Sequence, residues 1–119
     1  MSRHSAAARL AVIQDRLAVL GRSDVRIIAV TKTHGPEAVA ELLETGHLDF
    51  GENRVGEANA KYPLIPPSLP RPHLHYIGPL QSGQVRQVSD IFDYVHGASS
   101  IATVESLARE CARRRSEQK

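Results

Sequence analysis

The spacing of apolar residues alternates along the chain between the two patterns that distinguish helices from strands. Residues 5–20 have apolar side chains at intervals of three and four, which predicts a helix with one buried stripe. That stripe consists of Leu10, Ile13, Leu17 and Leu20. Residues 25–31 then form a short, almost continuous β-branched run, which is typical of a strand that is buried on both faces.

The same alternation continues to the end of the chain. Pro36 suits the first turn of a second helix, which Gly46 ends. The buried stripe of that helix is predicted at Val39, Leu42 and Leu43. Further strands are predicted at 48–50, 74–77 and 92–96, and further helices at 53–61, 81–89 and 102–115. The last helix is expected to turn Val104, Leu107, Ala108 and Cys111 inward.

This order of elements indicates an α/β fold with parallel strands, because each helical crossover returns the chain to the same end of the sheet. Two architectures fit the pattern. An open doubly wound sheet is complete with about four or five strands, whereas a (β/α)8 barrel has eight strands and typically about 250 residues. The length of 119 residues on its own favours the open sheet, as a single domain.

Composition and charge narrow the possible classes of function. The formal net charge is only +2, aromatic residues are 4% and tryptophan is absent, which argues against nucleic-acid binding by base stacking. No run of about 18 apolar residues occurs, and polar residues interrupt the N-terminal segment, so neither a membrane span nor a signal peptide is predicted. We therefore expect a cytoplasmic protein. The single cysteine, Cys111, and the spacing of the six histidines predict no disulfide and no metal site.

Residues with useful chemistry follow each of the predicted strands. Lys32 follows the first strand, Asn53 the second, Gly78 the third and Ser99 the fourth. Ligands bind at the carboxyl ends of parallel strands in open sheets and barrels alike, so these positions predict a ligand site. A partly desolvated lysine amine is neutral part of the time and can form a Schiff base with an aldehyde. The remaining lysines are placed differently, since Lys61 follows a predicted helix and Lys119 is the last residue.

Each of these residues also has a purely structural interpretation. The Lys32 ammonium group can extend into solvent, and Gly78 can simply turn the chain. Asn53 can cap the helix that follows it, and Ser99 or Ser100 can cap the last helix. Both interpretations remain open from the pattern alone.

Three segments stand out as motifs. They are Ile28-Ala29-Val30-Thr31-Lys32-Thr33, Asp49-Phe50-Gly51-Glu52-Asn53-Arg54 and His75-Tyr76-Ile77-Gly78-Pro79-Leu80-Gln81-Ser82. Together, and in this order, they resemble the motifs of the pyridoxal 5′-phosphate homeostasis proteins, a family once described as proline synthetase co-transcribed homologues. The resemblance covers about residues 10–112. It implies a (β/α)8 barrel similar to the N-terminal domain of alanine racemase, of which this chain has the first helix and about four βα units.

The resemblance also implies a cofactor site. It makes Lys32 the residue that holds pyridoxal 5′-phosphate as an internal aldimine, with Asn53, His75 and Gly78 in the neighbourhood of the cofactor. Ser99 stands about where the family often has an acidic residue, and we include it among the expected cofactor-binding residues. In the family, the second half of the barrel supplies most of the contacts to the phosphate group of the cofactor. That half has no counterpart in these 119 residues, so we expect this chain to bind the cofactor weakly.

The predicted function is therefore a non-catalytic, pyridoxal phosphate-binding protein of intracellular cofactor homeostasis, with residues 1–119 as one domain. The expected partners are the cofactor and the apo-enzymes that receive it, and the expected state is a monomer or a weak homo-oligomer.

Three different functions remain compatible with the pattern of residues. The first is a racemase-like enzyme, which would need an acid/base group opposite the cofactor. The candidates for that group are Tyr62, Tyr76, Tyr94 and Cys111. The second is a truncated, non-functional fragment. The third is a cofactor-free module that binds nucleic acid or a protein partner through its basic C-terminus.

Overall fold

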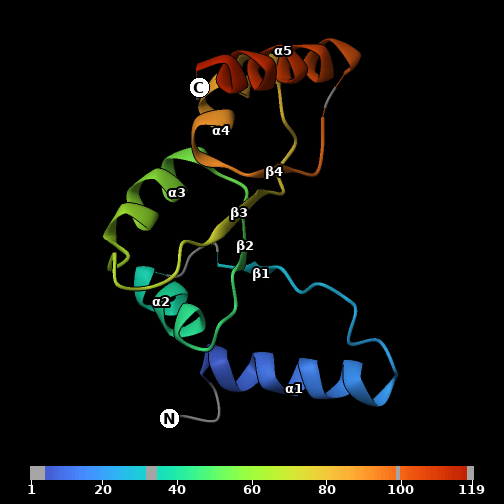
Figure 1. Ribbon diagram of the computed structural model, residues 1–119, viewed down its shortest axis with the longest axis vertical. Helices are drawn as coiled ribbons and strands as arrows, with labels where there is room; N and C mark the ends of the chain where they lie inside the picture. Colours follow the sequence, from blue (N-terminus) through green and yellow to red (C-terminus); the bar gives the residue numbers. More distant parts are fainter. Residues whose placement is uncertain (1–4, 32–34, 99, 118–119) are drawn as a thin grey trace.

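Four parallel strands, paired in chain order, form the single sheet of the computed structural model, which describes residues 5–31, 35–98 and 100–117. The strands are β1 (Ala29–Val30), β2 (Asp49–Glu52), β3 (His73–Tyr76) and β4 (Tyr94–Val95). Each strand pairs with the next one along the chain, and every pairing is parallel. The predicted α/β class and strand order are therefore confirmed (Figure 1).

The helices lie close to the predicted positions. They are α1 (Ala6–Val19), α2 (Pro36–Glu44), α3 (Val55–Lys61), α4 (Val85–Ile91) and α5 (Ile101–Glu117), with short 3-10 turns η1 (Tyr62–Leu64) and η2 (Ser82–Gln84). Pro36 opens α2, and the Ser5 hydroxyl caps α1 by accepting a hydrogen bond from the Ala8 N–H at 3.2 Å. None of the described helices has the length and apolar character that crossing a membrane requires.

The first strand is much shorter than its apolar run predicts. Only Ala29 and Val30 pair with β2, in register with Phe50 and Gly51. Residues 25–27 extend beyond the amino end of β2. The segment that lies beside them there is still the turn that follows α2 in the same chain. That turn contains Gly46 at a φ of +92°, a conformation that favours glycine. The predicted strand at 25–31 is therefore wrong over most of its length, because a β-branched run needs a partner to become a ladder.

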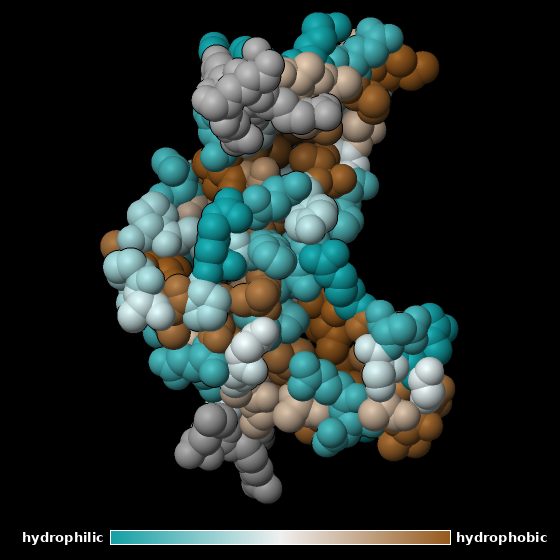
Figure 2. All heavy atoms as spheres, in the orientation of Figure 1, coloured by the Kyte–Doolittle hydropathy of each residue, from teal (hydrophilic) through white to brown (hydrophobic). Residues whose placement is uncertain are grey.

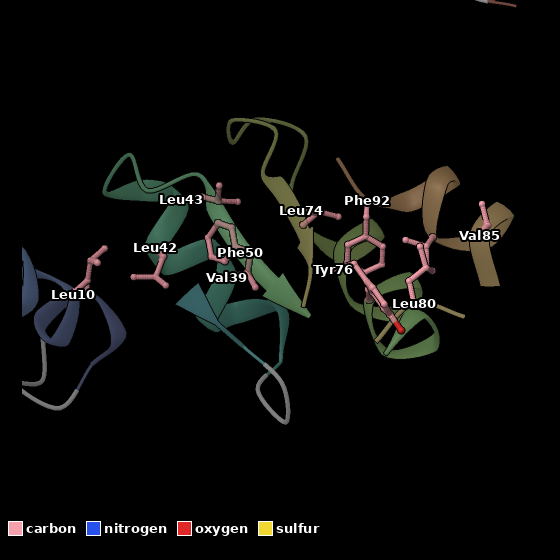
Figure 3. Close-up of a cluster of buried hydrophobic side chains, with 13 residues drawn as sticks. Leu10, Val39, Leu42, Leu43, Phe50, Leu74, Tyr76, Leu80, Val85 and Phe92 are labelled. Carbon is pink, nitrogen blue, oxygen red and sulfur yellow. The ribbon is translucent and has the colours of Figure 1, made fainter. Parts of the chain in front are cut away.

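One face of the sheet carries the hydrophobic core. Phe50, Leu74 and Tyr76 point to this face, and α2, α3 and α4 lie together on this side (Figures 1 and 3). Val39 and Leu43 of α2 are completely or almost completely buried against it. Tyr76 also meets Phe92 edge-on, with ring centroids 5.2 Å apart. Each fully buried large side chain of this kind contributes about 1.5–3 kcal/mol to stability.

The outer helices bury less of their apolar stripes than the sequence predicts. In α1 the buried residues are Ala7 and Leu10, whereas Ile13 and Leu20 are exposed. In α5 the buried residue is Thr103 and Leu107 is half-buried, whereas Val104, Ala108 and Cys111 are exposed. The predicted inward positions are wrong there because α1 packs mainly on α2 and α5 mainly on α4. Both helices lie beyond the edges of the sheet (Figure 1), so few of their side chains, among them Leu10 and Leu107, reach the core.

The packing around β2 predicts a large effect of one truncation. Replacing Leu43, which is 1% exposed, by alanine should lower the free energy of unfolding by about 2–5 kcal/mol, because it leaves a cavity beneath the sheet. The matched control is Leu64→Ala, since Leu64 is 67% exposed and its loss should change stability by less than about 0.5 kcal/mol. Urea unfolding followed by circular dichroism measures both. Equal losses for the two variants would contradict this description of the core.

Candidate functional site

The carboxyl ends of the strands meet along one edge of the sheet, and two predicted site residues lie side by side there. Asn53 directly follows β2, and Gly78 comes two residues after β3. A Cβ atom on Gly78 would lie 3.1 Å from the Asn53 carbonyl oxygen and 3.3 Å from the Asn53 Cβ, so any side chain at position 78 would crowd the Asn53 residue. Lys32 and Ser99, which are also predicted strand-end residues, lie outside the described residues.

The chain after β4 completes this edge. The Leu80 N–H donates to the Gly97 carbonyl oxygen at 3.1 Å, and Leu80 forms a parallel bridge with Ala98. Gly97 is also close to Gly78, because a Cβ on Gly97 would lie 3.7 Å from the Gly78 carbonyl oxygen. The backbone at the ends of β2, β3 and β4 is therefore closely packed around the buried Gly78, where a larger residue would not fit.

Two of the structural interpretations of these residues can be examined directly. Arg54, rather than Asn53, occupies the N-cap position of α3, and no side chain caps that helix. Ser100 caps α5, because its hydroxyl accepts a hydrogen bond from the Thr103 N–H at 3.2 Å. Asn53 is therefore left half-buried at the edge without a capping role.

A buried ion pair lies directly beneath the end of β1. The Lys61 ammonium is 3.0 Å from Glu52 Oε2 and donates to the Thr31 carbonyl oxygen at 2.7 Å. The Thr31 hydroxyl donates to the same Glu52 oxygen, and the Tyr62 hydroxyl donates to it at 3.0 Å. Glu52 is fully buried, and Thr31 and Lys61 are nearly so. We call this group, Thr31, Glu52, Lys61 and Tyr62, the strand-end cluster.

The strand-end cluster ties α3 to the last described residue before Lys32. Its charges cancel, and the hydrogen bonds satisfy most of the polar atoms, which is the condition for burying charge without a large cost. Burial raises the pKa of the Tyr62 hydroxyl well above its usual range, so Tyr62 stays protonated and remains a donor. Among the described residues, Glu52 Oε1 has no hydrogen-bond partner.

Sequence reasoning missed the role of Lys61, which it placed only as a residue that follows a helix. The residue is in fact the last one of α3, and its side chain is buried on the same face as Ala58. The signal was present in the chain, since Ala58 and Lys61 are three residues apart and share a helix face. A lysine on the buried face of a short helix requires a buried partner. Two carboxylates are within reach, Glu52 at 3.0 Å and Glu57 at 3.6 Å, and Glu52 is the fully buried one.

The opposite face of the sheet carries a row of polar side chains. Asp49 accepts two hydrogen bonds from Arg26, at 2.6 and 3.1 Å. His75 Nε2 lies 2.9 Å from Asp49 Oδ1, and His75 Nδ1 lies 2.9 Å from His96 Nε2. The Tyr94 ring stacks on His75 with centroids 4.4 Å apart. His75 is thus 2% exposed and lies in mid-sheet, one residue before the end of β3.

The direction of the hydrogen bonds in this row follows from Asp49. Hydrogen bonding to Arg26 lowers the pKa of Asp49 to about 2, so the carboxylate accepts a hydrogen bond from His75 Nε2–H at neutral pH. A single proton then lies between His75 and His96, and the row ends on the exposed imidazole of His96 beside Gly97. The described residues contain no group of three or more ligands suited to a metal ion.

Comparison with known proteins gives one consistent set of relatives. No family model matches the chain. The pyridoxal phosphate homeostasis protein of Vibrio cholerae is 43% identical over 77 residues, which are 63% of this chain and 33% of that protein. The protein of the same name from Escherichia coli K12 is 35% identical over 94 residues, which are 73% of this chain and 40% of that protein. The predicted resemblance is therefore confirmed.

Solved structures show the same likeness. The chain superimposes on PipY of Synechococcus elongatus PCC7942 with a TM-score of 0.70 and 38% identity, both without pyridoxal phosphate and with it bound. The match covers 85% of this chain and just under half of PipY. The chain thus has an α/β fold with a parallel sheet like that of PipY, and it spans only about one third to one half of the relatives it matches.

The strand-end cluster predicts that Lys61 is essential for stability. Lys61→Met should lower the free energy of unfolding by about 3–5 kcal/mol, because it leaves the Glu52 carboxylate buried without its counter-charge. The control is the double variant Lys61→Met with Glu52→Gln, which removes both charges. Its loss should be clearly smaller than the sum of the two single losses. Urea unfolding of the four proteins measures this coupling, and strictly additive losses would contradict a buried pair.

The Asp49 carboxylate predicts a specific pH dependence. Its folded-state pKa of about 2 lies below the usual value of about 3.9 for unfolded chains. The stability that it contributes is therefore present above about pH 4 and is lost as the pH falls toward 2. Asp49→Asn should remove this part of the acid sensitivity. Unfolding free energies measured from pH 6 to pH 2 check the prediction, and identical slopes for both proteins between about pH 4 and pH 2 would contradict it.

Proposed function

We propose that this chain binds pyridoxal 5′-phosphate at the carboxyl edge of its sheet and serves intracellular homeostasis of that cofactor. The observation that carries the proposal is the likeness to PipY in its pyridoxal phosphate-bound form, at 38% identity over 85% of this chain. The curated relatives, which are named for homeostasis of the same cofactor, give the role. The function concerns whole proteins more than twice as long as the matched segments, and we extend it here to this chain.

The residues at the edge suit this cofactor. Asn53 is half-buried beside Gly78 at the carboxyl edge, which is the edge where parallel α/β sheets and barrels bind their ligands. In our proposal Lys32 is the covalent anchor, Asn53 and Gly78 lie against the ring, and Ser99 completes the edge beyond β4. His75 lies one residue before the end of β3 and contributes indirectly, because its hydrogen bond orients the His96 ring. The cofactor supplies an aldehyde carbon, which reacts reversibly with a primary amine.

Among the lysines, Lys32 is the one best suited to this reaction. The Lys61 amine is buried and occupied by Glu52 and Thr31, so it is not available to a ligand. Lys32 directly follows Thr31, whose backbone is held by Lys61 and whose N–H donates to the Gly51 carbonyl oxygen at 3.4 Å. The residue before Lys32 is therefore held in place, and bringing the Lys32 amine to a ligand costs mainly the rotamer freedom of its own side chain.

We propose that the bound cofactor is held rather than used for catalysis. Each tyrosine candidate for an acid/base group is engaged in other contacts, and the cysteine candidate is exposed on a helix. Tyr62 stays protonated within the strand-end cluster, Tyr76 is buried in the core, Tyr94 stacks on His75, and Cys111 is exposed on α5. These positions support storage and delivery of the cofactor to apo-enzymes over racemisation.

The same proposal includes the compartment and the wider architecture. We place the function in the cytoplasm, where an exposed free thiol such as that of Cys111 is ordinary. We also propose that residues 1–119 fold as one domain and that their sheet is one half of a (β/α)8 barrel. The loops of a barrel that bind phosphate usually follow its last strands, so this chain alone should bind the cofactor weakly.

Borohydride reduction tests the proposal. Incubation of the chain with pyridoxal phosphate, reduction and peptide mapping by mass spectrometry should place the adduct on Lys32 and give little on Lys61 or Lys119. Lys32→Arg should abolish the adduct without loss of the circular dichroism signal of the folded chain, because only the nucleophile is removed. A label spread evenly over all three lysines, or an undiminished adduct in the variant, would contradict a site at the sheet edge.

A further inference from the structure

The strand β4 ends one residue earlier than the sequence predicts, and this gives His96 the strand-end position that the sequence assigned to Ser99. β4 ends at Val95, so His96 directly follows its strand, as Asn53 does after β2. The His96 N–H donates to the Tyr76 carbonyl oxygen at 3.1 Å, which holds His96 level with the end of β3. His96 therefore belongs to the carboxyl edge, where parallel sheets bind ligands.

A chain of hydrogen bonds along one face of the sheet leads to this residue. His75 lies in its middle, with Nε2 2.9 Å from Asp49 Oδ1 and Nδ1 2.9 Å from His96 Nε2. Figure 2 shows hydrophilic atoms gathered over the middle of the sheet, between α1 and α5. We call Asp49, His75 and His96 the histidine relay. It links the start of β2 to the carboxyl edge through side chains of β2, β3 and the residue after β4.

The direction of the histidine relay is fixed at Asp49. Its carboxylate is an acceptor at neutral pH, because the hydrogen bond from Arg26 lowers its pKa to about 2, so His75 donates to it through Nε2–H. A neutral imidazole has a single N–H, so His75 Nδ1 is an acceptor and His96 donates to it through Nε2–H. By the same rule His96 Nδ1 carries no proton and is itself an acceptor.

The opposite arrangement would need a doubly protonated His75 that donates to both neighbours. His75 is 2% exposed, and the carboxylate beside it is already paired with Arg26. The Arg26 guanidinium also lies 5.1 Å from the centroid of the Tyr94 ring, which stacks on His75. His73, at 3.7 Å from Asp49, faces the same carboxylate. A positive charge on His75 would therefore be buried beside another cation without a carboxylate of its own.

We propose that His96 is a ligand-binding residue of the carboxyl edge, which accepts a hydrogen bond from the ligand at Nδ1, and that Asp49 and His75 are positioning residues that act through it. The ligand group that it takes is a hydrogen-bond donor, such as a hydroxyl or a protonated ring nitrogen. For the identity of the ligand, pyridoxal phosphate, the inference rests on the proposed function. It adds a residue to that site and the polarity of one contact.

The position and the bonding of the ring support this role. Gly97, which directly follows His96, is close to Gly78, which in turn is close to Asn53, so His96 lies near the other edge residues. In the described part of the chain no hydrogen bond reaches His96 Nδ1. A buried carboxylate that fixes the tautomer of an imidazole leaves the outer nitrogen in a defined state. The acceptor is therefore prepared before a ligand arrives.

NMR of the histidine side chains tests the relay in the chain without ligand. Near neutral pH we expect a scalar coupling across the hydrogen bond between His75 Nδ1 and His96 Nε2, with the bonded proton attached to His96. Addition of pyridoxal phosphate should then shift the His96 Nδ1 resonance. A bonded proton on His75 Nδ1, the absence of coupling, or a His96 Nδ1 resonance that does not respond to bound ligand would overturn the inference.

Two substitutions separate the nitrogens of His96, because a Gln amide reaches about as far as Nε2 and an Asn amide about as far as Nδ1. His96→Gln keeps a donor for His75 but loses the acceptor. It should raise the dissociation constant of pyridoxal phosphate, measured by absorbance titration, about threefold to tenfold, which is the effect of one hydrogen bond. His96→Asn keeps an acceptor and should bind more tightly than His96→Gln.

A third substitution tests the positioning role of His75. His75→Gln can still donate to Asp49 but loses the bond to His96, so it should also weaken binding. Combined with His96→Gln it should cause little further loss, because both changes remove the same contact. The matched control is His73→Asn, which lies on the same strand and face at the amino end of β3. It should bind like the parent chain.

The outcomes distinguish this inference from the proposed function. Equal affinities of the parent chain and His96→Gln would overturn the role of His96 and leave cofactor binding intact. Additive losses in the double variant would overturn the role of His75 as a positioning residue. A parent chain that does not bind pyridoxal phosphate would overturn the proposed function and, with it, the ligand contact. The NMR measurements need no variant, so they decide the matter even if a substituted chain fails to fold.

Discussion

The buried pairing of Lys61 with Glu52 and Thr31 is the constraint on which the arrangement of the site depends. An ammonium and a carboxylate can be buried together only at hydrogen-bonding distance, and the 3.0 Å and 2.7 Å contacts of Lys61 meet that condition. They hold the last turn of α3 beneath the ends of β1 and β2. As a result, Thr31, the described residue that precedes Lys32 in the sequence, is held in place relative to Asn53, which directly follows Glu52.

The two faces of the sheet then serve different purposes. On the helix side, alternate residues of the strands are apolar and form the core with α2, α3 and α4. On the opposite face, the intervening residues are a glycine, a histidine, a tyrosine and a half-exposed valine. A strand that was buried only to stabilise the fold would carry apolar side chains in both directions. The sheet therefore has one apolar face and one polar face, on which Arg26, Asp49, His75 and His96 are linked by hydrogen bonds.

The sequence predicted the order, type and approximate position of nearly all elements, because apolar periodicity reports burial directly. It failed where burial depends on distant partners. Residues 25–27 did not extend β1, and Ile13 and Val104 are exposed, since their helices lie beyond the sheet. The contact of Asn53 with Gly78 followed from the convergence of strand ends. The pairing of Lys61 with Glu52 did not, because it depends on how α3 packs beneath the sheet.

A crystal structure of the chain grown with pyridoxal 5′-phosphate would decide whether the carboxyl edge of the sheet holds this cofactor through Lys32. We expect electron density that is continuous with the Lys32 amine and a ring that lies beside Asn53 and Gly78. Density on another lysine, or a cofactor bound on the helix-covered side of the sheet, would contradict a site at this edge.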